Sequence, residues 1–102
     1  MFPKDVPEQF GREQGCTLAD WARDLPGAVK HHRLDQPTPG QAVVHLAGGG
    51  RLHLQWQELP PRRIAMARLP RMQVDFRFDQ VDADARSAFM RHFDLFLQRG
   101  GG

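Results

Sequence analysis

The sequence predicts an α+β domain in the order helix, strand, strand, strand, helix. In the expected strand over residues 51–59, positions 51–57 alternate strictly between polar and apolar side chains, as a strand with one buried face does. A second alternating run ends at Phe78, and a capped amphipathic helix begins at Asp82. We therefore expect a three-stranded antiparallel meander with a long, kinked third strand and with both helices packed on one face.

The length and composition are those of one small folded domain. The 102 residues suffice for a hydrophobic core without metal or disulfide support, and 40% of them are hydrophobic. Residues 1–16 contain two prolines and two glycines without periodicity, so we expect an irregular arm there. The single domain is expected over residues 17–99, followed by a flexible glycine tail at 100–102.

The first seven residues include an acid and two prolines where a signal peptide has an apolar run, and no stretch has the length of a membrane span. We expect a cytoplasmic protein with no membrane partner. Cys16 is the only cysteine, which excludes an intramolecular disulfide and a cysteine-based zinc site. No cofactor is expected.

The first helix is expected to begin after Thr17, which can form a capping box with Asp20. Pro26-Gly27 is expected to end the helix, and residues 28–40 are expected to form a loop. Apolar residues at helical spacing predict its buried face: Leu18, Trp21, Ala22 and Leu25.

Residues 41–47 and 51–59 predict a β-hairpin, because the three glycines between them supply the positive φ values of a tight loop. We expect Ala47 to lie opposite Arg51, a register that places apolar residues together on one face. The same register places His45 opposite His53 on the polar face.

Residues 63–78 are expected to form one strand rather than two. Six apolar residues fall on even positions, although Arg68 and Pro70 interrupt the pattern. Leu69-Pro70-Arg71 lacks the glycine or asparagine of a tight turn, so a kink or bulge is expected there. Sixteen extended residues span roughly 50 Å, so the strand extends beyond its shorter partner. The apolar residues of this even phase are Ile64, Met66, Met72, Val74, Phe76 and Phe78.

The last helix is expected from Asp82, its N-cap, to Arg99, which precedes a glycine. Its core stripe consists of Ala85, Phe89, Phe93 and Phe96.

The overhanging end of the third strand supports the leading functional hypothesis. Ile64, Met66 and Leu69 form an apolar edge that a lone monomer leaves unpaired. We expect a non-enzymatic protein-interaction module that forms a homo-oligomer through these residues.

A second hypothesis is binding of nucleic acid or another polyanion. Residues 51–77 carry a net charge of +4, whereas the remainder of the chain carries −2. The candidate residues are Arg62, Arg63, Arg68 and Arg71. No aromatic residue lies between these arginines to stack on single-stranded bases.

A third hypothesis places a small ligand or a metal on the open face of the sheet, at His45, His53, Gln55, Asp75 and Arg77. Two imidazoles from adjacent strands can contact one ion, but zinc normally takes three or four protein ligands. We therefore assign no metal site.

The sequence does not predict an enzyme, and we assign no catalytic residue. The glycines at 48–50 are followed by a strand rather than by the helix N-terminus of a phosphate-binding loop. Cys16 has no partner base at a recognisable spacing. Five aspartates are expected at caps and turns, where backbone hydrogen bonding favours them: Asp20, Asp24, Asp79, Asp82 and Asp84.

Three segments resemble recurring sequence motifs of a family of short, uncharacterised proteobacterial-type proteins. They are Pro60-Pro61-Arg62-Arg63-Ile64-Ala65, Arg68-Leu69-Pro70-Arg71 and residues 93–102. The resemblance covers residues 17–102. It implies a small bacterial protein of unknown function and brings no activity, cofactor or catalytic residue.

Overall fold

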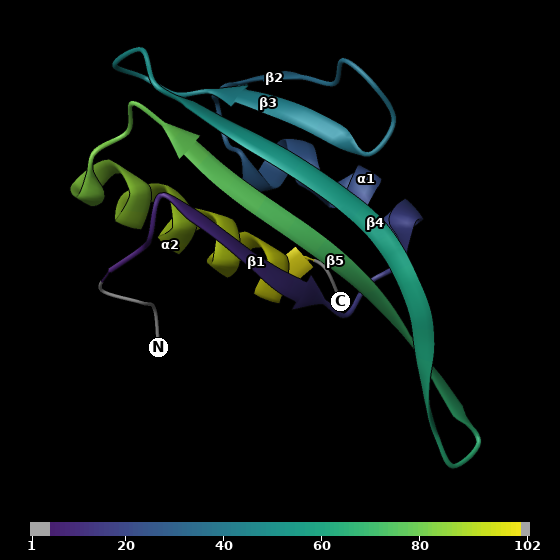
Figure 1. Ribbon diagram of the computed structural model, residues 1–102. Helices are drawn as coiled ribbons and strands as arrows, with labels where there is room; N and C mark the ends of the chain where they lie inside the picture. Colours follow the sequence, from purple (N-terminus) through teal and green to yellow (C-terminus); the bar gives the residue numbers. More distant parts are fainter. Residues whose placement is uncertain (1–4, 101–102) are drawn as a thin grey trace.

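The computed structural model describes residues 5–100, which form a five-stranded antiparallel sheet and two α-helices (Figure 1). The mixed α+β class is thereby confirmed. The strand order is β1-β5-β4-β3-β2. The helices are α1 (Leu18–Ala28) and α2 (Ala83–Gly100), and the strands are β1 (Gln9–Gln14), β2 (Arg33–Asp35), β3 (Gln41–His45), β4 (Arg51–Ile64) and β5 (Ala67–Asp79).

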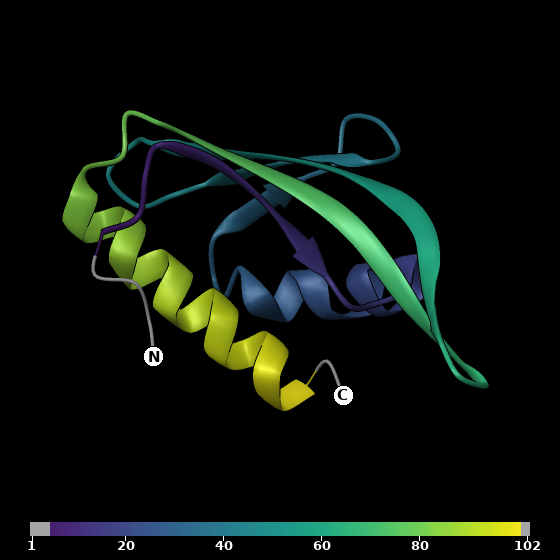
Figure 2. The same ribbon diagram turned by 60° about the horizontal axis from the view of Figure 1, so that its bottom comes forward.

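Both helices lie on the same side of the sheet (Figure 2). The hydrophobic core fills the space between the two helices and the sheet. Phe93 of α2 lies at the centre of this core, with its ring 5.6 Å from that of Phe76 of β5 and 6.0 Å from that of Trp21 of α1. Trp56 of β4 packs against Trp21 at the rim. The largest fully buried side chains include Trp21, Phe76, Phe93, Leu25, Leu52, Leu54 and Met72.

The expectation of three strands was wrong, because two more lie in segments that we expected to be irregular. β1 lies within the N-terminal segment 1–16 that was expected to be irregular, and it pairs with β5. β2 lies within the expected loop 28–40 and pairs with β3. The inward face of β1 contains Phe10, which stacks on Phe76 at 4.7 Å, and Arg12. A strand with a charged residue at an inward position does not show the alternation that predicts a strand.

α1 continues past the expected stop at Pro26-Gly27 and ends at Ala28. The capping box between Thr17 and Asp20 is confirmed at its start. Gly27 does not end the helix but lets it approach α2, because a Cβ at this position would lie 2.1 Å from Cζ of Phe96. The proline forfeits one helical hydrogen bond, and packing against α2 holds the last turn.

The β3–β4 hairpin has the expected faces but a different register. Val44 lies opposite Leu52 and Val43 opposite His53, a shift of two residues from the expected pairing. The loop spans Leu46–Gly50, closed by a hydrogen bond from Leu46 N to Gly50 O of 2.9 Å. Because the shift is even, every side chain keeps its face. The expected pairing of His45 with His53 was wrong.

Gly50 is needed for close approach to the segment that follows β5. A Cβ here would lie 2.5 Å from Cγ2 of Val81 and 2.6 Å from the backbone oxygen of Gln80. We expect Gly50→Ala to lower the free energy of unfolding by about 1–3 kcal/mol, measured by urea denaturation. Gly11→Ala is the control, because its Cβ would meet only the ends of the Asp75 and Gln73 side chains, which can swing aside. An equal loss in both variants would contradict this reading.

The expected single strand over residues 63–78 was also wrong. The chain reverses at Ala65-Met66, so that β4 and β5 form a hairpin with Ile64 opposite Ala67. Ala65 has φ +54°, a left-handed conformation that costs alanine about 1–2 kcal/mol. The turn therefore forms without the glycine or asparagine that usually marks such a turn in a sequence.

Candidate functional site

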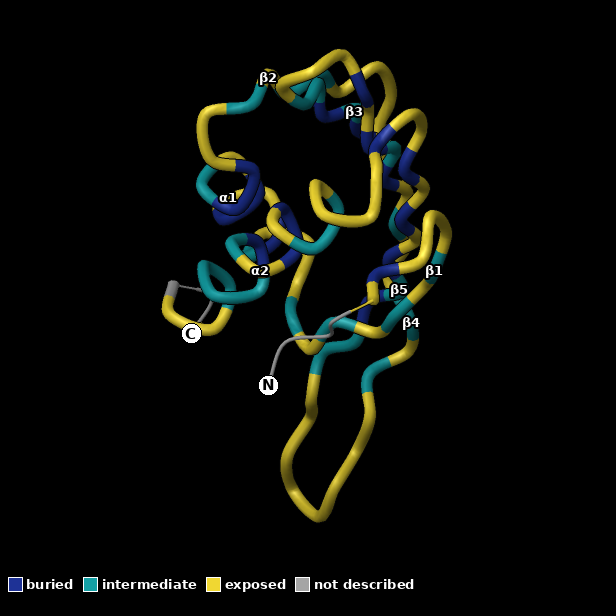
Figure 3. Tube along the Cα trace, turned by 90° about the vertical axis from the view of Figure 1, so that its left-hand side faces the viewer, coloured by how far each residue is buried: buried dark blue, intermediate teal, exposed yellow. Residues whose placement is uncertain are grey.

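The end of the β4–β5 hairpin projects from the body of the protein (Figure 1). We call residues 59–71 the arm. β3 pairs with β4 only as far as Gln55, and β1 pairs with β5 only as far as Met72, so the two strands of the arm pair only with each other. Most of the arm is exposed, in contrast to the sheet from which it extends (Figure 3).

A β-bulge at the base of the arm exchanges the faces of β4. Leu59 lies opposite Arg71, but the next pair is Arg62 with Leu69, so β4 has one extra residue at Pro60-Pro61. A bulge of this kind reverses the alternation of the strand beyond it. Ile64 therefore lies on the open face of the sheet and not on the core side, which its even position predicts. The proline pair in the sequence is the signal that could have indicated the bulge.

The arm consequently has two different faces. One, the apolar face, contains Ile64, Ala67 and Leu69, on the same side of the sheet as Glu13 and Arg71. Ile64 is 55% exposed, Leu69 43%, and Met66, at the turn, 100%. The structure thus brings together the three residues predicted for self-association at the end of a projecting ribbon.

Two of the four candidate arginines belong to an ion-pair cluster with Glu13 of β1. Arg71 donates to Glu13 at 2.8 Å and to the backbone oxygen of Pro60 at 3.2 Å, and Arg62 lies 3.8 Å from Glu13. The hydrogen bond from Arg71 lowers the pKa of Glu13, so the carboxylate stays charged at neutral pH. Glu13 was missed by the sequence reasoning because it lies in the segment expected to be irregular.

The other two candidate arginines, Arg63 and Arg68, form the second face of the arm, the basic face. They lie directly opposite each other on adjacent strands, and both are exposed. Within residues 5–100, no carboxylate pairs with either of them. The expected four-arginine site is therefore two pairs with different surroundings on opposite faces of the arm.

Prolines protect the edges of the arm. Pro60 and Pro61 lie in β4 and Pro70 in β5, and none of them has an N–H group to donate to an added strand. Proline on an exposed strand is a common device against edge-to-edge pairing. The edges of the arm are therefore poorly suited to the addition of another strand.

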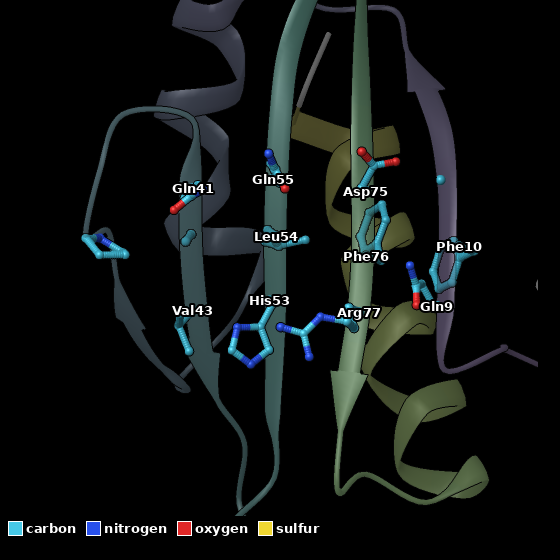
Figure 4. A pocket seen from close by; sticks show the side chains of 13 residues that line it. Gln9, Phe10, Gln41, Val43, His53, Leu54, Gln55, Asp75, Phe76 and Arg77 are labelled. Carbon is cyan, nitrogen blue, oxygen red and sulfur yellow. The ribbon is translucent and has the colours of Figure 1, made fainter.

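The open face of the sheet is hollowed into a trough of about 760 Å³ (Figure 4). Four of the five predicted open-face residues line it: His53, Gln55, Asp75 and Arg77. The fifth, His45, lies outside and donates from Nε2 to Asp35 at 2.8 Å. That bond lowers the pKa of Asp35.

Figure 4 shows His53 of β4 beside Arg77 of β5 on the floor of the trough. Burial lowers the pKa of His53 below its ordinary value, and Arg77 lowers it further. In the described part of the chain, no group of three or more histidine, cysteine or acidic side chains is placed to hold a metal ion. The trough offers amide, imidazole, carboxylate and guanidinium groups without an enclosed cavity.

No protein-family model matches the chain, and no curated protein matches it at a significant level. Neither helix between residues 5 and 100 combines the length and apolar composition of a membrane-crossing segment.

Proposed function

We propose that this protein is a non-enzymatic interaction module that self-associates through the apolar face and the tip of its arm. The observation that carries the proposal is the exposure of Ile64, Met66 and Leu69 together at the end of the projecting ribbon. Exposed apolar side chains are ordinary when scattered, but a group of them on a projecting element is typical of an interaction surface.

The charges around the apolar face favour a second copy of the chain as the partner. Glu13 neutralises one of the two positive charges of Arg62 and Arg71, so two apolar faces repel each other less than two basic faces do. Neither Arg63 nor Arg68 is paired with a carboxylate within residues 5–100, so two basic faces repel each other. A two-fold arrangement is therefore expected, in which the apolar faces of two arms pack against each other.

The experiment is sedimentation velocity at tens of micromolar protein. We expect a dimer for the natural sequence and a monomer for Met66→Ser/Leu69→Ser, because both substitutions replace exposed apolar groups at the proposed contact. The separated monomer should stay folded, with an unchanged circular dichroism spectrum, since neither residue belongs to the core.

Leu18→Ser is the matched control, because Leu18 and Leu69 are both 43% exposed and Leu18 lies on α1. We expect this variant to remain a dimer. A monomer for the natural sequence, or equal dissociation of the Leu18 and the arm variants, would contradict self-association through the arm.

A further inference from the structure

We propose that the basic face of the arm, Arg63 with Arg68, binds the phosphate backbone of double-stranded DNA without reading its base sequence. Like charges directly opposite each other in an antiparallel pair destabilise the hairpin. A phosphate group between them removes this repulsion. Arginine suits phosphate because its planar guanidinium donates two parallel hydrogen bonds. The site is complete in one copy and does not depend on self-association.

The shape of the arm favours a duplex as the ligand. B-DNA has a major groove about 12 Å wide, which admits a two-stranded β-ribbon. The arm is such a ribbon, and neither β1 nor β3 accompanies it to its end. Duplex RNA fits less well, because its major groove is deep and narrow. Single-stranded nucleic acid is disfavoured because residues 59–71 contain no aromatic side chain for base stacking.

An acidic peptide is the main competing ligand, and the edges of the arm argue against it. Extended peptides usually bind by adding a strand to an open sheet edge. Pro60, Pro61 and Pro70 remove backbone donors from both edges of the arm. A rigid duplex needs no strand pairing, since its phosphates are contacted by side chains.

The expected binding is weak and mainly electrostatic. Each neutralised phosphate contributes about −0.9 to the slope of log K against log salt, so two arginines predict a slope of about −1.8. Residues outside the arm carry a net charge of −2 and add no attraction.

The test is fluorescence anisotropy of a short labelled DNA duplex of random sequence, titrated with the full chain at several salt concentrations. We expect Arg63→Gln/Arg68→Gln to weaken binding about tenfold or more at low salt and to flatten the slope. The matched control is Arg33→Gln/Arg51→Gln, which removes the same charge at the other end of the sheet and should bind nearly as the natural chain does. Met66→Ser/Leu69→Ser should retain a slope of about −1.8, because it keeps both arginines.

Three results would overturn the proposal. The first is the absence of DNA binding by the natural chain at low salt. The second is an equal loss of DNA affinity in Arg63→Gln/Arg68→Gln and in the control Arg33→Gln/Arg51→Gln. The third is tighter binding of a polyglutamate peptide or of an RNA duplex of the same length. Since the arginine variant keeps Met66 and Leu69, its sedimentation should still give a dimer, which separates this test from that of self-association.

Discussion

Phe93→Ala is expected to lower the free energy of unfolding by about 3–5 kcal/mol, the usual range for removing a buried phenylalanine. Phe93 has no exposed surface, and its ring contacts the rings of Phe76, Trp21 and Phe89. Its removal leaves a cavity where α1, α2 and the sheet meet. For a domain whose total stability lies in the range of about 5–15 kcal/mol, such a loss is severe.

The measurement is urea denaturation followed by circular dichroism, with Phe96→Ala as the control on the same helix. Phe96 is only partly buried and packs at the edge of the core, so its truncation should cost clearly less. Equal losses at the two positions would show that the centre of the core does not lie at Phe93.

Asp94→Ala is expected to cost about 2 kcal/mol, between the values for exposed and for fully buried ion pairs. Asp94 accepts a hydrogen bond from Arg12, and the exposed fractions of the two side chains are 15% and 30%. The Arg12 guanidinium also lies 5.1 Å from the centre of the Phe76 ring, and its Nε is buried without a hydrogen-bond partner. Without Asp94, the positive charge of Arg12 stays half-buried against the rings of Phe76 and Phe93 without its carboxylate partner.

Two further variants test that explanation. Arg12→Met/Asp94→Leu removes both charges and should recover much of the lost stability, because apolar residues of similar size replace the pair. Asp35→Ala removes the partner of Arg33 and His45 at an exposed site and should change the free energy of unfolding much less than Asp94→Ala does. A double variant as unstable as Asp94→Ala alone would show that packing, rather than charge, explains the loss.

The elements with clear periodicity could be predicted from the sequence, and those with compensating tertiary contacts could not. α2 was correctly predicted with its cap, which is confirmed by the hydrogen bond from Ala85 N to Asp82 at 2.8 Å. β1 was missed because Arg12 takes an inward position that an apolar residue normally fills, and Asp94, 82 positions away, makes that possible. No local pattern indicates a contact across such a distance.

The residues of the candidate site were largely identified, but not their arrangement. Ile64, Met66 and Leu69 are exposed together as expected, although on a hairpin rather than on an overhanging strand. The turn was missed because Ala65 adopts a positive φ that sequence rules reserve for glycine or asparagine. The bulge divides the four arginines between two faces, and Glu13 pairs with the two on one of these faces. Neither the bulge nor the contact with Glu13 follows from the spacing of the arginines in the sequence.

The place of β1 in the sheet sets the order in which the chain can fold. β2, β3, β4 and β5 follow one another and pair with their neighbours in sequence, whereas β1 must wait for β5 before it has a partner. Pairing between distant segments closes large loops and is slow. β1 therefore cannot join the sheet until β5 has been synthesised, and until then Phe76 lacks the stacked ring of Phe10.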